Sequence, residues 1–177
     1  MPAIWLGHRP PSRKGGSTIP PNIGLSDAQR QGVIQILTPL LSDEYVLYTK
    51  THNYHWNVVG PQFNDLHDFF QDQYTELNKV ADDVAERIRA LGQPAIGTLA
   101  EFVQHTRLKE HPGHYPGARD MLANLLADHE SVIQRLRVDL ETCDEEYHDM
   151  GTNDFLTGLM ARHEKMAWML RAFLEGG

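Results

Sequence analysis

One long apolar stripe constrains the fold of this chain more than any other feature. Between residues 63 and 91 apolar side chains recur at steps of three or four residues, and the stripe comprises Phe63, Leu66, Phe70, Tyr74, Leu77, Ala81, Val84, Ile88 and Leu91. That period places them on one face of an α-helix. Gly60-Pro61 stands before the stripe and Gly92 after it, which are common residues at helix starts and stops. The pattern therefore predicts one helix of about 30 residues, long for a globular protein.

Three further segments show the same helical period. The first begins near Ser26, because Ser26 and Gln29 have the spacing of a capping box, and continues toward His55. The other two occupy residues 122–140 and 155–173. Residues 93–116 are broken by proline and glycine and leave room for one short helix at residues 99–104. With no alternating strand pattern, the sequence predicts an all-α, ferritin-like four-helix bundle with a long crossover, containing that short helix, between the second and third helices.

Composition limits what this bundle can do. The 177 residues suit a single domain, residues 26–177, preceded by a proline-rich and glycine-rich flexible arm, residues 1–25. The arm carries Arg9, Arg13 and Lys14 and no acid, whereas the whole chain has a net charge of -8. Because a phosphate backbone repels an acidic body, only the arm could contact DNA. The sequence has neither a membrane-spanning apolar run nor a signal peptide, so we expect a cytoplasmic protein with no membrane partner.

Two histidines stand almost evenly about the Gly60-Pro61 break. His55 precedes Gly60 by five residues and His67 follows it by seven. If the flanking helices fold back as an antiparallel hairpin, both imidazoles reach the same height and can meet. Such a pair is either half of a transition-metal site or a pair of hydrogen-bonded packing residues. The single cysteine, Cys143, cannot supply a thiolate cluster, so any metal must be held by His, Asp and Glu.

An acidic pair lies farther along the same helix. Asp82 and Glu86 are four residues apart, so their carboxylates can converge on one cation, although such a pair alone is more often a solvated face that Arg87 or Arg89 neutralises. His67 and Asp82 are 15 residues apart, which is about 22 Å along a straight helix. One chain cannot bring both halves to one metal. An antiparallel copy related by a two-fold axis near Tyr74 can, and it creates two equivalent sites per dimer.

A site inside one bundle is the alternative. It would need two Glu-x-x-His repeats, and only Glu145 to His148 has that spacing, beside a helix break. His129 and His163 fall on the apolar stripes of the third and fourth helices, where we expect hydrogen-bonded core residues. We therefore disfavour the intrabundle site.

The motifs that frame these residues resemble a known family. The segments "LYTKTHNYHWNVVGPQFNDLHDFFQDQY", "DDVAERIRALG" and "HEKMAWMLRAFL" are similar to those of the Dps family, ferritin-like miniferritins named as DNA-binding proteins from starved cells. The resemblance covers residues 26–174 and not the arm. It implies a ferroxidase centre between two-fold-related subunits, with His55 and His67 from one subunit and Asp82 and Glu86 from the other as iron ligands.

The resemblance also implies roles for other residues. Gln71 stands where the family has an acidic residue, so one iron position is expected to be weaker or water-mediated. Trp56 matches a tryptophan thought to intercept oxidising equivalents, with packing at the helix end as its ordinary role. Asp149 and Asp154 resemble residues that line three-fold iron-uptake pores, and helix capping is their ordinary role.

These expectations add up to one function with two alternatives. The resemblance implies a shell of twelve subunits, built from two-fold dimers, in which Fe(II) at a two-iron centre is oxidised by hydrogen peroxide, or more slowly by dioxygen, and stored. One alternative is a nucleoid-coating protein that binds DNA through Arg9, Arg13 and Lys14, with its metal site secondary. The other is a shell that prefers zinc or manganese because of Gln71.

Overall fold

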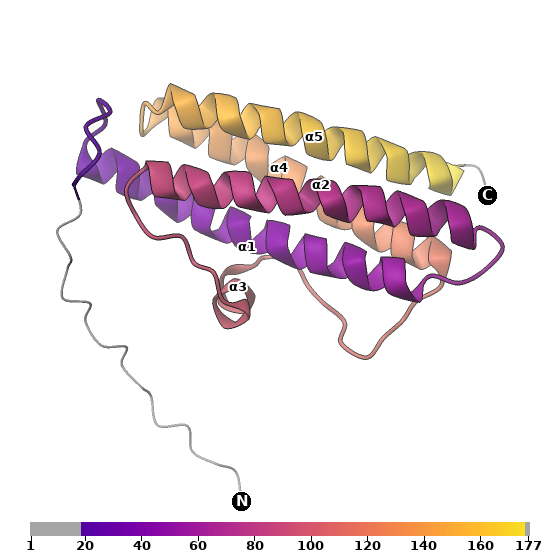
Figure 1. The fold of residues 1–177 in the computed structure, drawn as a ribbon. Helices are drawn as coiled ribbons and strands as arrows, with labels where there is room; N and C mark the ends of the chain where they lie inside the picture. Colours follow the sequence, from indigo (N-terminus) through magenta and orange to yellow (C-terminus); the bar gives the residue numbers. More distant parts are fainter. Residues whose placement is uncertain (1–18, 176–177) are drawn as a thin grey trace, which may run out of the picture.

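The computed structural model describes residues 19–175, which form five α-helices (Figure 1). The helices are α1 (Asp27–Asn57), α2 (Phe63–Ala90), α3 (Leu99–His105), α4 (Ala118–Glu145) and α5 (Met150–Glu175). α1 packs along α2, and α4 packs along α5, as two antiparallel hairpins. The crossover between α2 and α4 runs back along the whole bundle, so these two helices point the same way (Figure 1). The predicted four-helix bundle with its long crossover is confirmed.

Local sequence signals set where two of these helices begin. At the start of α1, the Ser26 hydroxyl accepts the Gln29 N–H at 3.3 Å and the Gln29 side chain accepts the Ser26 N–H at 2.9 Å, the predicted capping box. Thr98 and Glu101 make the same exchange at the start of α3. These side chains satisfy backbone donors that a helix leaves unpaired. The short helix predicted at residues 99–104 is α3, longer by one residue.

The core consists of two apolar clusters placed end to end along the bundle. One cluster includes Leu41, Val132 and Leu159, and the other includes Leu47, Leu125 and Met166. Along α1, α4 and α5, the residues between these positions include three fully buried polar side chains, which are Glu44, His129 and His163. A polar layer therefore separates the two apolar clusters.

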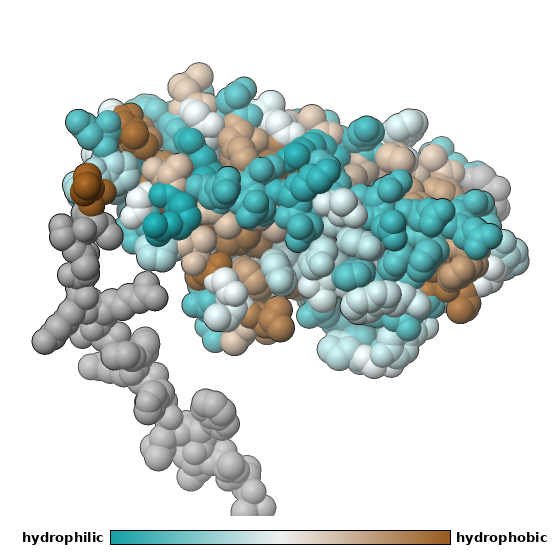
Figure 2. Space-filling model, viewed as in Figure 1, coloured by the Kyte–Doolittle hydropathy of each residue, from teal (hydrophilic) through white to brown (hydrophobic). Residues whose placement is uncertain are grey.

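The surface of the bundle is mostly hydrophilic. Figure 2 shows hydrophilic side chains along α2, with an apolar patch over α3, where Leu99 and Val103 are exposed. None of the helices in residues 19–175 combines the length and the apolar character that crossing a membrane requires. Residues 19–25 of the predicted arm form no helix or strand, and the remainder of the arm lies outside the described residues.

Candidate metal centre

His55 and His67 meet where α1 passes into α2. Their rings stack with centroids 3.7 Å apart. His55 Nδ1 lies 2.8 Å from the backbone oxygen of His67, and His67 Nδ1 lies 2.9 Å from the backbone oxygen of His55. The contact predicted from their spacing about Gly60-Pro61 is confirmed. Gly60 has φ 125°, a conformation that glycine adopts without steric cost.

The reciprocal bonds fix the proton on each ring. A carbonyl oxygen can only accept, so each Nδ1 must carry the hydrogen and donate it. In the neutral imidazole the other nitrogen, Nε2, then has a free lone pair. This is the way a protein commonly prepares histidine to bind a metal, with one nitrogen anchored and the other available. The pair is therefore chemically suited to the ligand role predicted for it.

Asp82 and Glu86 lie exposed on the same helix, near its other end. Within residues 19–175 neither carboxylate forms an ion pair or a hydrogen bond. Arg87, which could have neutralised them, instead donates to Asp149 and Thr152. The neighbouring Asp83 is bonded by Arg162 at 2.8 Å, so its charge is compensated while that of Asp82 is not. The acidic pair thus lies on an open surface without a cationic partner in the described residues.

The two half-sites are too far apart to meet within one chain. α2 is a continuous helix from Phe63 to Ala90, so the 15 residues from His67 to Asp82 correspond to about 22 Å. Among residues 19–175, no three His, Cys, Asp or Glu side chains converge as a metal site. Burial raises the pKa of the Cys143 thiol to about 12, so this residue is no thiolate ligand either. A complete coordination sphere needs ligands from outside the chain.

The surroundings of the histidine pair include a residue that the sequence did not reveal. His52 lies one turn before His55 on α1, with ring centroids 4.1 Å from Trp56 and 4.2 Å from Tyr74. Burial, followed by the neighbouring His55, lowers the pKa of His52, which favours its neutral form. The three-residue spacing between His52 and His55 is the sequence pattern that could have indicated its position. Trp56 itself is 66% exposed, and Gln71 is exposed on α2.

His129 and His163 belong to the buried polar layer. Their Nδ1 atoms are 3.0 Å apart, so the predicted hydrogen-bonded core pair is confirmed. His163 Nε2 lies 3.0 Å from the carboxylate of Glu44, although neither group has a hydrogen bond at these atoms within residues 19–175. Glu44 was not identified from the sequence. An acidic residue between Leu41 and Val46, within an apolar stripe, is a pattern that could have indicated a buried acid. The three groups form a chain and do not converge on one point.

The other intrabundle candidates point away from the core. Glu145 ends α4 and His148 lies in the following turn with φ 54°, both exposed to solvent. They cannot contribute to a site at the bundle centre.

The two predicted pore acids differ from each other. Asp149 is 4% exposed, accepts from Arg87, and bonds the backbone N–H and hydroxyl of Thr152 at the start of α5. It therefore caps α5, the ordinary role considered for it. Asp154 is exposed and carries no ion pair within residues 19–175. The predicted DNA-contact residues Arg9, Arg13 and Lys14 lie outside the described residues.

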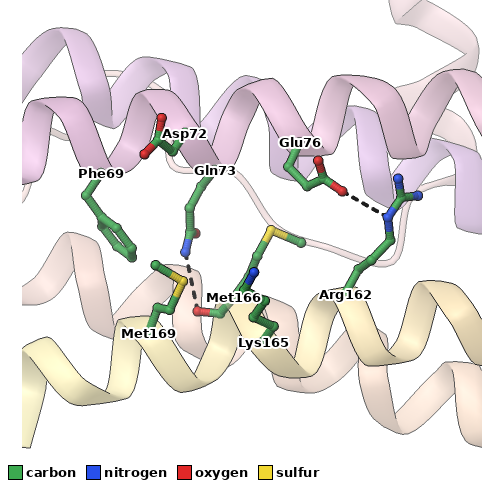
Figure 3. Close-up of a pocket in the computed structure, with 8 residues that line it drawn as sticks. All are labelled: Phe69, Asp72, Gln73, Glu76, Arg162, Lys165, Met166 and Met169. Carbon is green, nitrogen blue, oxygen red and sulfur yellow. Dashed lines mark hydrogen bonds and ion pairs between the residues drawn. The ribbon is translucent and has the colours of Figure 1, made fainter.

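A groove of about 370 Å³ lies between α2 and α5 (Figure 3). Its apolar lining comes from Phe69, Met166 and Met169, and its charged lining includes Glu76 and Arg162, which form an ion pair at 2.9 Å. It contains no imidazole, so the histidine pair and this groove are separate features of the bundle.

Comparison with known proteins agrees with the fold. The ferritin-like domain family matches residues 34–176. A low temperature-induced protein of Nostoc sp., itself uncharacterized, is 52% identical over 88% of this chain and 87% of its own length. The DNA protection during starvation protein 2 of Bacillus anthracis is 38% identical over 67% of this chain and 80% of its own.

A solved structure is also similar. The crystal structure of the Dps protein from Vibrio cholerae O1, described as a member of a broad superfamily of ferritin-like diiron-carboxylate proteins, has a TM-score of 0.82 and 30% identity. The match covers 90% of this chain and 99% of that one.

Proposed function

Because the chain belongs to the Dps family of ferritin-like proteins, we propose that it is a ferroxidase that oxidises Fe(II) and stores the product as a ferric mineral. Membership of this family supports iron storage and protection from oxidative damage as the general role. The reaction, its site and its oxidant are the specific part of the proposal. We place the activity in the cytoplasm.

The site proposed for Fe(II) lies between two subunits. His55 and His67 of one subunit face Asp82 and Glu86 of the other when α2 crosses its copy near Tyr74. The observation that carries this proposal is the reciprocal Nδ1 bonding, which leaves both Nε2 lone pairs free, with no carboxylate of residues 19–175 of the same chain completing a site. Imidazole and carboxylate together are a ligand set that suits Fe(II), as well as zinc and manganese.

The proposed reaction uses these residues in defined ways. Two Fe(II) ions bind as substrates and each gives up one electron. Hydrogen peroxide takes both electrons, and its O–O bond breaks to give two hydroxide ions. The carboxylates of Asp82 and Glu86 stabilise the higher charge of Fe(III). The Nδ1–H bonds hold both rings in place while that charge changes. Trp56 is exposed beside His52 and would intercept oxidising equivalents that escape the site.

Storage requires a closed shell, which we propose has twelve subunits. An assembly of this kind would cover the exposed Leu99 and Val103 of α3, and also the exposed Asp82 and Glu86 of α2. Asp154 is the better of the two predicted pore residues, because Asp149 is buried and held by Arg87. Dioxygen serves as the slower alternative oxidant.

Kinetics under anaerobic conditions test the activity. The protein mixed with Fe(II) and hydrogen peroxide should form Fe(III) well above the rate in buffer. The variants His67→Ala and Asp82→Ala should each lose at least about 100-fold, since each removes a ligand that acts directly on the substrate. Asp83→Ala is the matched control, because Asp83 is the adjacent acid and is bonded by Arg162. Equal rates in protein and buffer would refute the proposal.

Mixing the two inactive variants tests the shared site. Each His67→Ala/Asp82→Ala heterodimer contains one doubly damaged site and one intact site. Random reassociation should therefore restore about a quarter of the wild-type rate, because half the dimers are mixed and each has one of its two sites intact. If each site lay within one chain, mixing the two variants would restore no activity.

The alternatives have less support. DNA binding depends on Arg9, Arg13 and Lys14, outside the described residues, and the remainder of the chain is acidic. A preference for zinc or manganese would appear in metal analysis of the purified protein and in an Fe(II) titration.

A further inference from the structure

His52 is held in a fixed orientation beside the proposed iron site. Trp56 and Tyr74 lie 4.1 and 4.2 Å from its ring centroid, and no contact joins Trp56 to Tyr74 among the aromatic pairs of residues 19–175. The two rings therefore cover opposite faces of the imidazole. Tyr48 also lies 5.6 Å from the His52 ring centroid, and within the described residues neither imidazole nitrogen has a hydrogen-bond partner. A half-buried imidazole fixed by stacking and left without a partner is prepared for a ligand.

The register of the α1/α2 hairpin places His52 level with Gln71. His55 faces His67, and the helices are antiparallel, so one turn back on α1 corresponds to one turn forward on α2. The contact of His52 with Tyr74, three residues beyond Gln71, agrees with this register. Gln71 is exposed and has no hydrogen bond within residues 19–175. The register thus places an imidazole and an amide, neither with a hydrogen-bond partner in the described residues, at a similar height along the hairpin.

The two-fold arrangement, which is part of the proposed function, brings a carboxylate to within about one helical turn of this level. An axis midway between His67 and Asp82 passes near Tyr74 and sets the partner's Asp82 opposite His67. It also sets the partner's Asn78 opposite Gln71, since each lies four residues nearer the axis. Two cations about 3.5–4 Å apart can share one bridging carboxylate. The outer cation would then lie at His55 and His67, and the inner one at the level of His52, 6.1 Å away between ring centroids.

We infer that His52 is a ligand of the inner cation and supplies the donor that Gln71 does not. An amide oxygen is a weaker ligand for Fe(II) than a carboxylate, so Gln71 alone would leave the inner position poorly held. An imidazole nitrogen restores a strong donor but brings no negative charge. The inner position should therefore favour Fe(II), Co(II) and Zn(II) over Mn(II) and Mg(II), which prefer oxygen ligands.

Anaerobic titration with Co(II) alone tests this inference, since it measures binding and not turnover. The assembled wild-type protein should bind two Co(II) per subunit. His52→Phe keeps a ring between Trp56 and Tyr74 but has no donor nitrogen, and it should bind one. The dissociation constant of the second Co(II) should rise by more than the roughly 10–100-fold that loss of an outer-shell partner costs. His114→Ala, an exposed histidine on the crossover, is the control and should bind two.

A second variant distinguishes ligation from packing. Gln71→Glu in the His52→Phe background supplies a carboxylate to the inner position and should restore the second Co(II). Two unaltered Co(II) per subunit in His52→Phe would overturn the inference. The inference would also be overturned if His52→Ala lost the second Co(II) and His52→Phe kept it. That result would show that His52 acts by stacking between Trp56 and Tyr74 and not as a ligand.

Failure of this inference can be told apart from failure of the proposed function. If His67→Ala binds no Co(II) while His52→Phe binds two, the shared site is correct and His52 is not a ligand. If His67→Ala still binds two, the proposed site itself is wrong, whatever His52 does.

Discussion

Two histidine pairs join helices in this bundle, and they are built in opposite ways. His55 and His67 each donate Nδ1–H to the other's backbone carbonyl, which leaves both Nε2 atoms available at the edge of the bundle. His129 and His163 instead bond to each other through Nδ1 at 3.0 Å, at the centre of the bundle and with no solvent exposure. The difference indicates that only the outer pair keeps an imidazole nitrogen free for a metal to bind.

A carboxyl group lies beside the buried pair, whereas no carboxyl group lies beside the outer pair within residues 19–175. His163 lies 3.0 Å from the carboxylate of Glu44, which is itself fully buried and has no hydrogen-bond partner within residues 19–175. A buried carboxylate loses the favourable hydration that it has in water, so it depends on the histidine beside it. We therefore expect the inner pair to govern stability and the outer pair to govern metal binding.

Removing the inner partner of Glu44 should have the largest effect. His163→Ala leaves the buried carboxylate uncompensated and should lower the free energy of unfolding by about 3–5 kcal/mol. Denaturant unfolding at one fixed protein concentration measures this. The Glu44→Leu, His163→Leu double variant is the control and should lose less, because no buried charge remains. Unfolding of His163→Ala at the wild-type midpoint would show that the polar layer contributes nothing.

Lowering the pH should destabilise the protein through the buried pair, and this effect should be of intermediate size. Burial, with a smaller contribution from His163, lowers the pKa of His129 well below its ordinary 6.5. Below pH 6.5 the unfolded chain therefore takes up a proton that folded His129 refuses, and stability falls as the pH falls. His129→Gln should remove up to about 1.4 kcal/mol per pH unit of this loss. Urea unfolding from pH 7 to pH 5 compares the two proteins, and parallel curves would contradict the expectation.

Removing a member of the outer pair should have the smallest effect on stability. His67→Ala loses one side-chain hydrogen bond to a backbone carbonyl and should cost about 1 kcal/mol. The same variant should lose Co(II) binding, so its effect on stability should be small and its effect on binding large. Thermal unfolding of the metal-free protein gives the first and titration gives the second. A loss of stability as large as that of His163→Ala would remove the distinction between the pairs.

Much of the fold could be predicted because its signals are local. The apolar period of α2 and the capping box at Ser26 depend on residues within a few positions of one another, and the structure confirms both. The contact of His55 with His67 could also be predicted, because one short turn fixes their register. Their role as iron ligands, with that of Asp82 and Glu86, stays a prediction.

Other features could not be predicted because they depend on packing between distant helices. Glu44 and His163 are 119 residues apart in the sequence and meet only when the α1/α2 and α4/α5 hairpins pack against each other. Arg87 could have neutralised Glu86 on its own helix, yet it crosses to Asp149, 62 residues away, where the carboxylate is buried and the ion pair is less screened. Those pairings decide which acids remain free.

The sequence by itself determined the helices, the turn that joins the first two of them, and the separation of the imidazoles from the acids along α2, because each follows from residue spacing on a rigid helix. Only the tertiary structure decided which polar groups are bonded to partners on other helices and which remain free to bind a ligand. The physical reason is that burial makes an unpaired charge costly, so distant partners are drawn together wherever the fold excludes water.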